Sequence, residues 1–172
     1  MKTNFFKFLA LCLILAISVL AEAVAAATSP DIVKAKQEAE AKGYTFITNH
    51  NEIVANANKE RKLRVLSSMD AAVVTRMADL FKKRYPFMDV HAEELSGPEA
   101  QQRFLLELKA GRVTNWDIAE ASEDFYNDYP PYLKKFDILG MAEQGVLAIN
   151  PKMVDSDNRN IVALASTLYA VG

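Results

Sequence analysis

A strand, a helix and a second strand follow one another within residues 63–97, and this order constrains the fold more than any other feature. Residues 63–68 form a short apolar run rich in strand formers, and residues 87–95 form a second extended run. A helical pattern lies between them, in which apolar residues recur every three or four positions: Val73, Met77, Leu80, Phe81 and Tyr85. Pro86 ends this helix. Strand, helix and strand within about 30 residues make a βαβ unit, which builds parallel sheets. We therefore predict an α/β fold, with an open, mostly parallel sheet and flanking helices.

Three loops of this sheet are candidate ligand sites, because ligands of open α/β sheets bind beyond the carboxyl ends of the strands. The first loop follows residues 63–68, and the second follows residues 87–95. The third follows a short strand that we predict within residues 115–121. The candidate ligand-binding residues are Ser67, Ser68, Met69 and Asp70 in the first loop, Ser96 and Gly97 in the second, and Ser122 and Glu123 in the third.

The first loop has a binding interpretation and a purely structural one. The hydroxyls of Ser67 and Ser68 can donate to or accept from a polar ligand, and the amides beyond them open a helix. Alternatively, Ser68 only caps that helix. Asp70 in the first helical turn would repel an anion and favour a cation, a metal or a polyol, or it only stabilises the helix dipole.

The second loop also allows two interpretations. Gly97 lets a ligand approach the backbone closely, and free amides at the start of the next helix can hold an anion. Alternatively, Ser96 and Glu99 form an ordinary capping box. Tyr126, Tyr129 and Tyr132 either line a cleft or pack around the turn at residues 130–131.

The remaining chain predicts three more helices and one more strand. Helices are expected at residues 30–42 and 51–62, and another at residues 98–110 with Phe104, Leu105 and Leu108 pointing inward. Residues 134–151 are interrupted by Gly and Pro, which predicts irregular structure. Residues 161–171 are apolar on both faces, as in a central buried strand. Residues 28–62 would thus be a helical extension that precedes an α/β domain at residues 63–172.

The first 27 residues have the pattern of a secretory signal peptide. Lys2 and Lys7 precede an apolar run at residues 8–20, and small residues follow at 21–27. This predicts export to the periplasm with removal of the leader; the alternative is an N-terminal membrane anchor. The only cysteine, Cys12, lies within this segment, so the mature chain would have no cysteine-based site.

Composition argues against several classes of function. The net charge is only −2 and no basic stripe is present, so we expect no nucleic-acid partner. The two histidines, His50 and His91, lack the paired spacing of a metal site. GxSxG, P-loop and HExxH motifs are missing from the sequence. We therefore expect no catalytic activity, no metal site and no cofactor.

Several segments in this order resemble a known family. They are LRVLSSMD (63–70), LFKKRYP (80–86), EELSG (93–97), LELKAG (106–111), NWDIAEAS (115–122) and NIVALASTLYAVG (160–172). Together they resemble the amino-terminal part of a periplasmic or extracellular solute-binding protein of an ABC importer. The group is the iron(III), polyamine and thiamine type, with the type II periplasmic-binding-protein fold.

The resemblance implies a function and a domain organisation. It implies capture of a small polar or metal-containing solute and its transfer to an ABC permease at the membrane. Such proteins have two lobes of ordinary domain size, so the resemblance also implies that these 172 residues hold the first lobe only, as a truncated protein. The iron ligands of relatives, a His among them, are not matched in the loop at residues 67–70. The alternative is a stand-alone exported sensor or interaction domain without a transport role.

Overall fold

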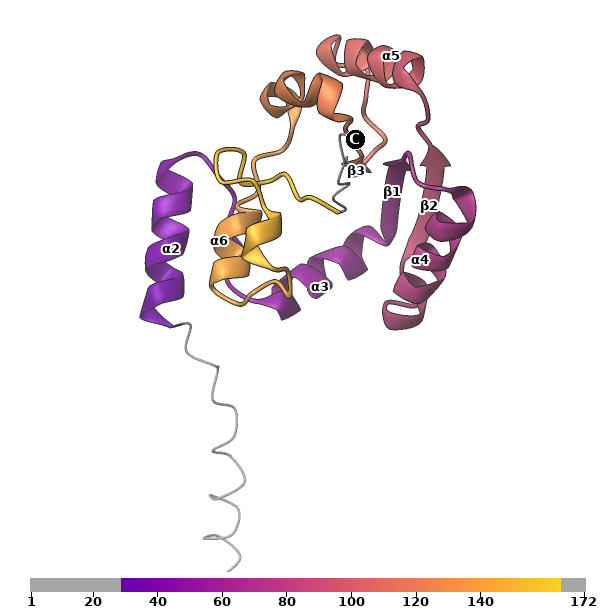
Figure 1. The fold of residues 1–172 in the computed structure, drawn as a ribbon. Coiled ribbons are helices and arrows are strands. Elements are labelled where there is room, and N and C mark those ends of the chain that lie inside the picture. Colours follow the sequence, from indigo (N-terminus) through magenta and orange to yellow (C-terminus); the bar gives the residue numbers. More distant parts are fainter. Residues whose placement is uncertain (1–28, 165–172) are drawn as a thin grey trace, which may run out of the picture.

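The computed structural model describes residues 29–164, which form five α-helices, three strands and three short 3₁₀ turns (Figure 1). In chain order the elements are α2 (Pro30–Ala41), α3 (His50–Glu60), β1 (Lys62–Ser67), α4 (Ala71–Arg84), β2 (Asp89–Glu94), α5 (Pro98–Lys109), β3 (Ile118–Ala119), η1 (Glu123–Asp128), η2 (Pro130–Tyr132), α6 (Ile138–Glu143) and η3 (Pro151–Met153). The predicted signal segment at residues 1–27 lies outside the described residues.

The three strands form one parallel sheet in the order β2-β1-β3, which confirms the predicted α/β class. Lys62 pairs with Asp89 at one end of β1, and Ser67 pairs with Glu94 at the other. Val65 pairs with Ile118 of β3. The connection through α4 leads to one side of β1, and the connection through α5 leads to the other side. This reversal is the topological switch point of an open α/β sheet, and it falls between β1 and β3.

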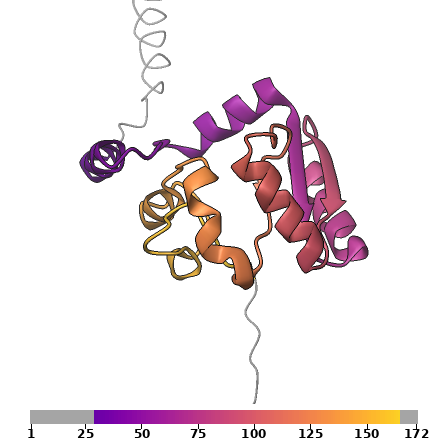
Figure 2. The same ribbon diagram turned by 90° about the horizontal axis from the view of Figure 1, so that it is seen from above.

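Helices α4 and α5 cover opposite faces of the sheet. Neighbouring strand residues point to opposite faces. Leu66 packs in the cluster that α5 builds, whereas the next residue, Ser67, lines a cavity beside α4. Seen from above, α5 and α4 lie on either side of the strands (Figure 2). The predicted βαβ unit is therefore present, with β1 shifted by one residue toward the N-terminus and β2 three residues shorter than the predicted run at 87–95.

The core is divided into two hydrophobic clusters. The first lies between the sheet and α5 and comprises Leu66, Leu95, Phe104, Leu105 and Tyr129, with Leu108 partly buried against it. The predicted inward residues of α5 are thus confirmed. The second cluster joins α2 to α6 and comprises Ala39, Phe46, Met141 and Val146. The two N-terminal helices therefore do not stand free, because α2 packs against α6 and Ile53 of α3 packs against the same cluster.

The prediction of irregular structure at residues 134–151 is wrong for its central part, where α6 forms. Asp137 begins this helix, and its carboxylate accepts from the Gly140 amide at 2.8 Å. The same carboxylate accepts from Arg159 through Nε at 2.8 Å and through the terminal nitrogen at 3.1 Å. Asp137 is only 2% exposed. The Asp137 cap and the buried ion pair stabilise a helix that the sequence did not predict, because Gly140 and Gly145 favour irregular structure.

The strand predicted at residues 161–171 does not form over its described part. Val162 makes a single antiparallel bridge to Val154, and Leu164 is 58% exposed. Residues 165–171 lie outside the described part of the chain. The described sheet is therefore bounded by β2 on one side and by β3 on the other.

The apolar face of α4 is exposed, although its spacing is that of a helix face. Val73 is 47% exposed, Met77 and Leu80 are 51% exposed, and Phe81 is 36% exposed. Val74 and Ala78 instead line the cavity beside β2. Within residues 29–164, none of the helices has the length and the apolar character needed to cross a membrane.

Candidate functional site

The ends of β1, β2 and β3 bring the three predicted loops to the same edge of the sheet. The Leu95 amide donates to the Ser67 carbonyl at 2.9 Å, which holds the end of β2 beside the end of β1. On the other side, the Glu120 amide donates to the Leu66 carbonyl at 2.9 Å. The loops after β1 and β3 therefore meet at the switch point of the sheet.

A carboxylate that the sequence did not single out, that of Glu120, lies at the centre of this site. Its Oε2 atom accepts from the Ser67 hydroxyl at 2.8 Å and from the Ser68 amide at 2.9 Å. The Ser67 oxygen in turn accepts from the Met69 amide at 3.2 Å. Ser67 is only 7% exposed, so these contacts lie below the exposed residues of the loop.

These contacts keep Glu120 ionised. Partial burial acts to raise the pKa of Glu120, but the hydrogen bonds from Ser68 and Ser67 outweigh it, and the pKa lies below its ordinary value of 4.5. A carboxylate with two donors on one oxygen is stabilised in its charged form. Glu120 therefore brings a negative charge to the edge of the sheet at neutral pH.

The charge of Glu120 decides which ligands the site favours. Its Oε2 already takes the donors of Ser67 and Ser68 that an anion would use. Among residues 29–164, Oε1 makes no hydrogen bond, so it is the acceptor left for a ligand. The geometry thus favours a solute that is cationic or carries hydroxyl or amine donors.

The other two residues of the first loop have separate roles. Met69 lines the cavity beside α4, and Asp70 is the N-cap of α4, whose carboxylate accepts from the Ala72 amide at 2.8 Å. The interpretation of Ser68 as the helix cap is therefore wrong. Asp70 takes that position because its carboxylate reaches the amide two residues ahead.

The second loop does not form the capping box that its sequence suggests. The N-cap of α5 is Gly97, without a side-chain cap, and Ser96 is exposed. Gly97 has φ 83°, a conformation that side chains with a Cβ rarely adopt, while no atom lies within 4 Å of where a Cβ would be. The observed role of Gly97 is thus to adopt this backbone conformation, and the space beside its Cα atom is open.

The third loop is fixed by Gln101 of α5, a second residue that the sequence did not single out. Gln101 is buried, and its side-chain oxygen accepts from the Ser122 amide at 2.9 Å. The Ser122 hydroxyl accepts from the Asp124 amide at 3.2 Å and so caps η1. Glu123 is exposed at the surface. Of the predicted pair, Ser122 is a structural cap and Glu123 does not join the Glu120 contacts.

A cavity of about 310 Å³ opens beside the first loop, between α4 and β2. Ser67, Met69 and Glu94 line one end, and Lys82 lines the other. Its described lining also includes the carboxyl-bearing residues Asp79 and Glu93. Of the eight predicted residues, only Ser67 and Met69 line this cavity, and its charge again favours a cationic solute.

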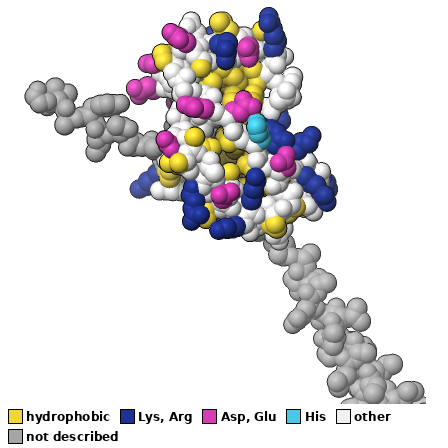
Figure 3. Space-filling model, turned by 90° about the vertical axis from the view of Figure 1, so that its right-hand side faces the viewer, with side chains coloured by type: hydrophobic (Ala, Val, Ile, Leu, Met, Phe, Trp, Pro, Cys, Tyr) yellow, Lys and Arg dark blue, Asp and Glu magenta, His cyan; other side chains and the backbone are white. Residues whose placement is uncertain are grey.

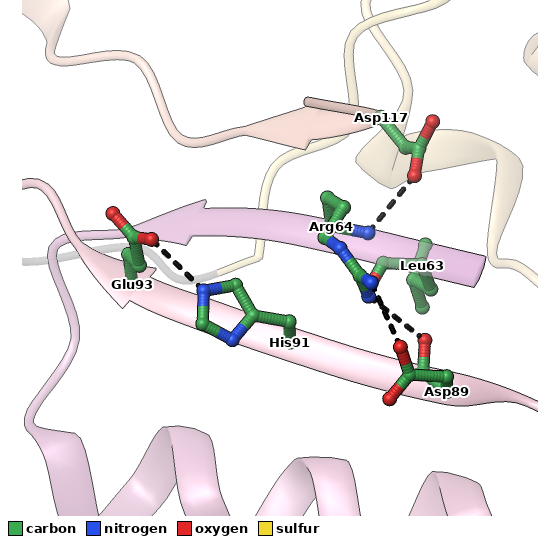
Figure 4. A network of polar contacts seen from close by, with 6 residues as sticks. All are labelled: Leu63, Arg64, Asp89, His91, Glu93 and Asp117. Carbon is green, nitrogen blue, oxygen red and sulfur yellow. Dashed lines mark hydrogen bonds and ion pairs between the residues drawn. The ribbon is translucent and has the colours of Figure 1, made fainter. Parts of the chain in front are cut away.

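Polar contacts around Arg64 lie toward the amino ends of the strands and have a structural role, whereas the nearby His91–Glu93 contact lies closer to the carboxyl ends (Figure 4). The Arg64 guanidinium contacts the Asp89 carboxylate at 2.7 Å, and the Arg64 amide donates to Asp117 at 2.9 Å. The hydrogen bond and the charge of Arg64 lower the pKa of Asp89. His91 points along the same face, and its Nε2 atom lies 2.8 Å from Glu93. Arg64 thereby ties β1 to both of its neighbours.

Residues 29–164 contain no group of three His, Cys, Asp or Glu side chains placed to hold a metal ion. Comparisons with protein-family models, with curated proteins and with solved structures found no match for this chain.

Proposed function

We propose that this chain captures a small polar solute outside the cytoplasm and delivers it to the permease of an ABC importer. The observation that supports the proposal is the meeting of Ser67, Ser68 and Glu120 at the switch point of a parallel sheet. Open α/β sheets bind small molecules at this position. The chain would act as one lobe of a type II periplasmic-binding-protein fold.

The carboxylates at the carboxyl edge of the sheet favour a particular group of solutes. The Glu120 carboxylate is charged, and the cavity beside it carries further carboxylates. Amines, polyols and hydrated or chelated metal cations offer the donors or the positive charge that such a surface complements. Small acids and sugar phosphates would meet repulsion.

A panel of solutes tests the proposal. The mature full chain is screened by thermal shift against polyamines, neutral sugars, metal salts, sugar phosphates and small dicarboxylic acids. We expect stabilisation by a polyamine, a polyol or a metal salt, because a ligand that binds only the folded state raises the melting temperature. Stabilisation by the acids or phosphates alone would contradict the assignment of Glu120.

Export is a separate part of the proposal and has its own test. The charged start, apolar run and small residues predict cleavage within residues 25–28. Intact-mass measurement of the protein recovered from the periplasm should show a chain that begins there. A recovered chain that keeps residues 1–21 would contradict export by a cleaved signal peptide.

A second candidate function is that of an exported sensor or interaction domain. The exposed apolar face of α4 favours it, because soluble proteins rarely leave such a face uncovered without a partner. The genes beside this one distinguish the two functions. Permease and ATPase genes would support solute capture, whereas a signalling neighbour would support the interaction domain.

A further inference from the structure

Helix α4 presents an apolar stripe to solvent along its length. The stripe comprises Val73, Met77, Leu80 and Phe81, and at least a third of each of these residues is exposed. In Figure 3, which shows the side of the molecule on which α4 lies, hydrophobic side chains come to the surface between acidic and basic ones. None of the residues of α4 is buried. The stripe is therefore available to a partner.

Two pairs of residues on this face of α4 lie symmetrically about Met77. Val73 and Phe81 lie four positions before and after Met77, and Asp70 and Arg84 lie seven positions before and after it. Because a helix repeats every 3.6 residues, positions four and seven residues away share one face. This face is therefore acidic at its start, apolar in its middle and basic at its end.

We propose that this face is the interface of a homodimer, in which two copies of α4 pack antiparallel about a two-fold axis at Met77. The symmetry places each Asp70 opposite the partner subunit's Arg84, and each Val73 opposite the partner subunit's Phe81. A two-fold interface requires such self-complementarity, since the same patch serves on both subunits. A parallel arrangement would instead set Asp70 against Asp70 and Arg84 against Arg84.

The remaining charges of α4 are compatible with this arrangement. Arg76, Asp79, Lys82 and Lys83 lie one, two, five and six positions from Met77 and so off the shared face, and Asp79 and Lys82 line the cavity beside β2. They therefore bring no like charge into the contact. The positive dipole end of each helix also lies beside the negative end of the other. A helix of 14 residues is about 21 Å long, which gives a contact at the lower limit of specific interfaces. We therefore expect a weak dimer, with a dissociation constant in the micromolar range.

Sedimentation velocity of the mature full chain tests the dimer from low micromolar to several hundred micromolar concentration. The wild type should shift from monomer to dimer over this range. Met77→Lys places two positive charges on the axis and should abolish the dimer. Arg84→Asp sets Asp70 against a second carboxylate and should raise the dissociation constant at least about tenfold. Arg112→Asp makes the same charge change outside α4 and should leave the dimer unchanged.

Mixing two variants tests the antiparallel charge pairing itself. The Arg84→Asp chain carries carboxylates at both ends of the stripe, and the Asp70→Arg chain carries guanidiniums at both ends. Each should associate weakly alone, whereas the mixture should form a heterodimer with both ion pairs restored. Circular dichroism shows whether each variant keeps its helices. A wild type that stays monomeric at every concentration, or a mixture no tighter than its components, would overturn the proposal.

Discussion

The Glu120 carboxylate lies 2.8 Å from the Ser67 hydroxyl oxygen, and this contact joins residues 53 positions apart in the chain. It links the loop after β3 to the last residue of β1. The amide of Ser68 shares the same carboxylate oxygen at 2.9 Å. One charged group, the Glu120 carboxylate, thus connects the loops after β1 and β3. Its ionisation should therefore affect how the free energy of unfolding depends on pH.

We predict that Glu120 makes stability depend on pH in acid. Folding lowers the pKa of Glu120 below 4.5, so the unfolded chain binds the proton more readily than the folded chain. Its contribution to stability is therefore present above pH 4.5 and is lost as the pH falls through the folded-state pKa. Urea unfolding between about pH 6 and pH 3 should show a steeper loss for the wild type than for Glu120→Gln. Exposed Glu123→Gln serves as the control and should follow the wild type; equal slopes for all three chains would contradict the contact.

Two tyrosines that differ in hydrogen bonding should respond oppositely to removal of their hydroxyls. Tyr129 is 2% exposed, and its hydroxyl has no hydrogen-bond partner among the described residues. The Tyr126 hydroxyl donates to Asp155 at 2.6 Å. Tyr129→Phe should leave stability unchanged or raise it by about 1 kcal/mol, whereas Tyr126→Phe should lower it by about 1 kcal/mol. Chemical denaturation of both variants measures this. A clear loss of stability in Tyr129→Phe would show that its hydroxyl has a partner.

A methyl group at Gly140 should disturb the buried ion pair of Asp137 and Arg159. A Cβ at this position would lie 2.5 Å from Oδ2 of Asp137, far inside contact distance. Gly140→Ala should therefore lower stability by about 1–3 kcal/mol, although alanine normally favours a helix. The same substitution in an Asp137→Ala background, where the clashing carboxylate is gone, should cost much less. An equal cost in both backgrounds would place the strain elsewhere.

Replacing Arg159 with a neutral residue should lower the stability of the protein more than breaking an exposed ion pair does. Its guanidinium makes two contacts with Asp137, whose side chain is 3% exposed. Arg159→Leu leaves that carboxylate buried without its partner, and we expect a loss of about 3 kcal/mol in the free energy of unfolding. Lys34→Leu removes an exposed pair with Glu38 and should change stability by under about 1 kcal/mol. Similar losses in the two variants would contradict the role of the buried pair.

The local part of the fold was predictable from sequence, because apolar spacing and helix-ending residues act over a few positions. The βαβ unit, the three parallel strands and the inward face of α5 follow from such patterns. The position of Glu120 did not, because Glu120 precedes the predicted loop residues Ser122 and Glu123, and its contacts join residues 53 and 52 positions apart in the chain. Periodicity also identified the residues that share the face of α4, but not that this face is exposed in the described structure. That depends on contacts between distant parts of the chain.

Isothermal titration of the best solute from the panel into wild type, Glu120→Gln and Glu123→Gln tests solute capture at the sheet edge most directly. Glu120→Gln keeps the size of the side chain and removes its charge, whereas Glu123→Gln makes the same change in an exposed side chain of the same loop. We predict that Glu120→Gln weakens binding at least about tenfold, since a charge-assisted contact is lost, and that Glu123→Gln binds like the wild type. Equal affinities for all three chains would contradict a binding site at the ends of β1 and β3.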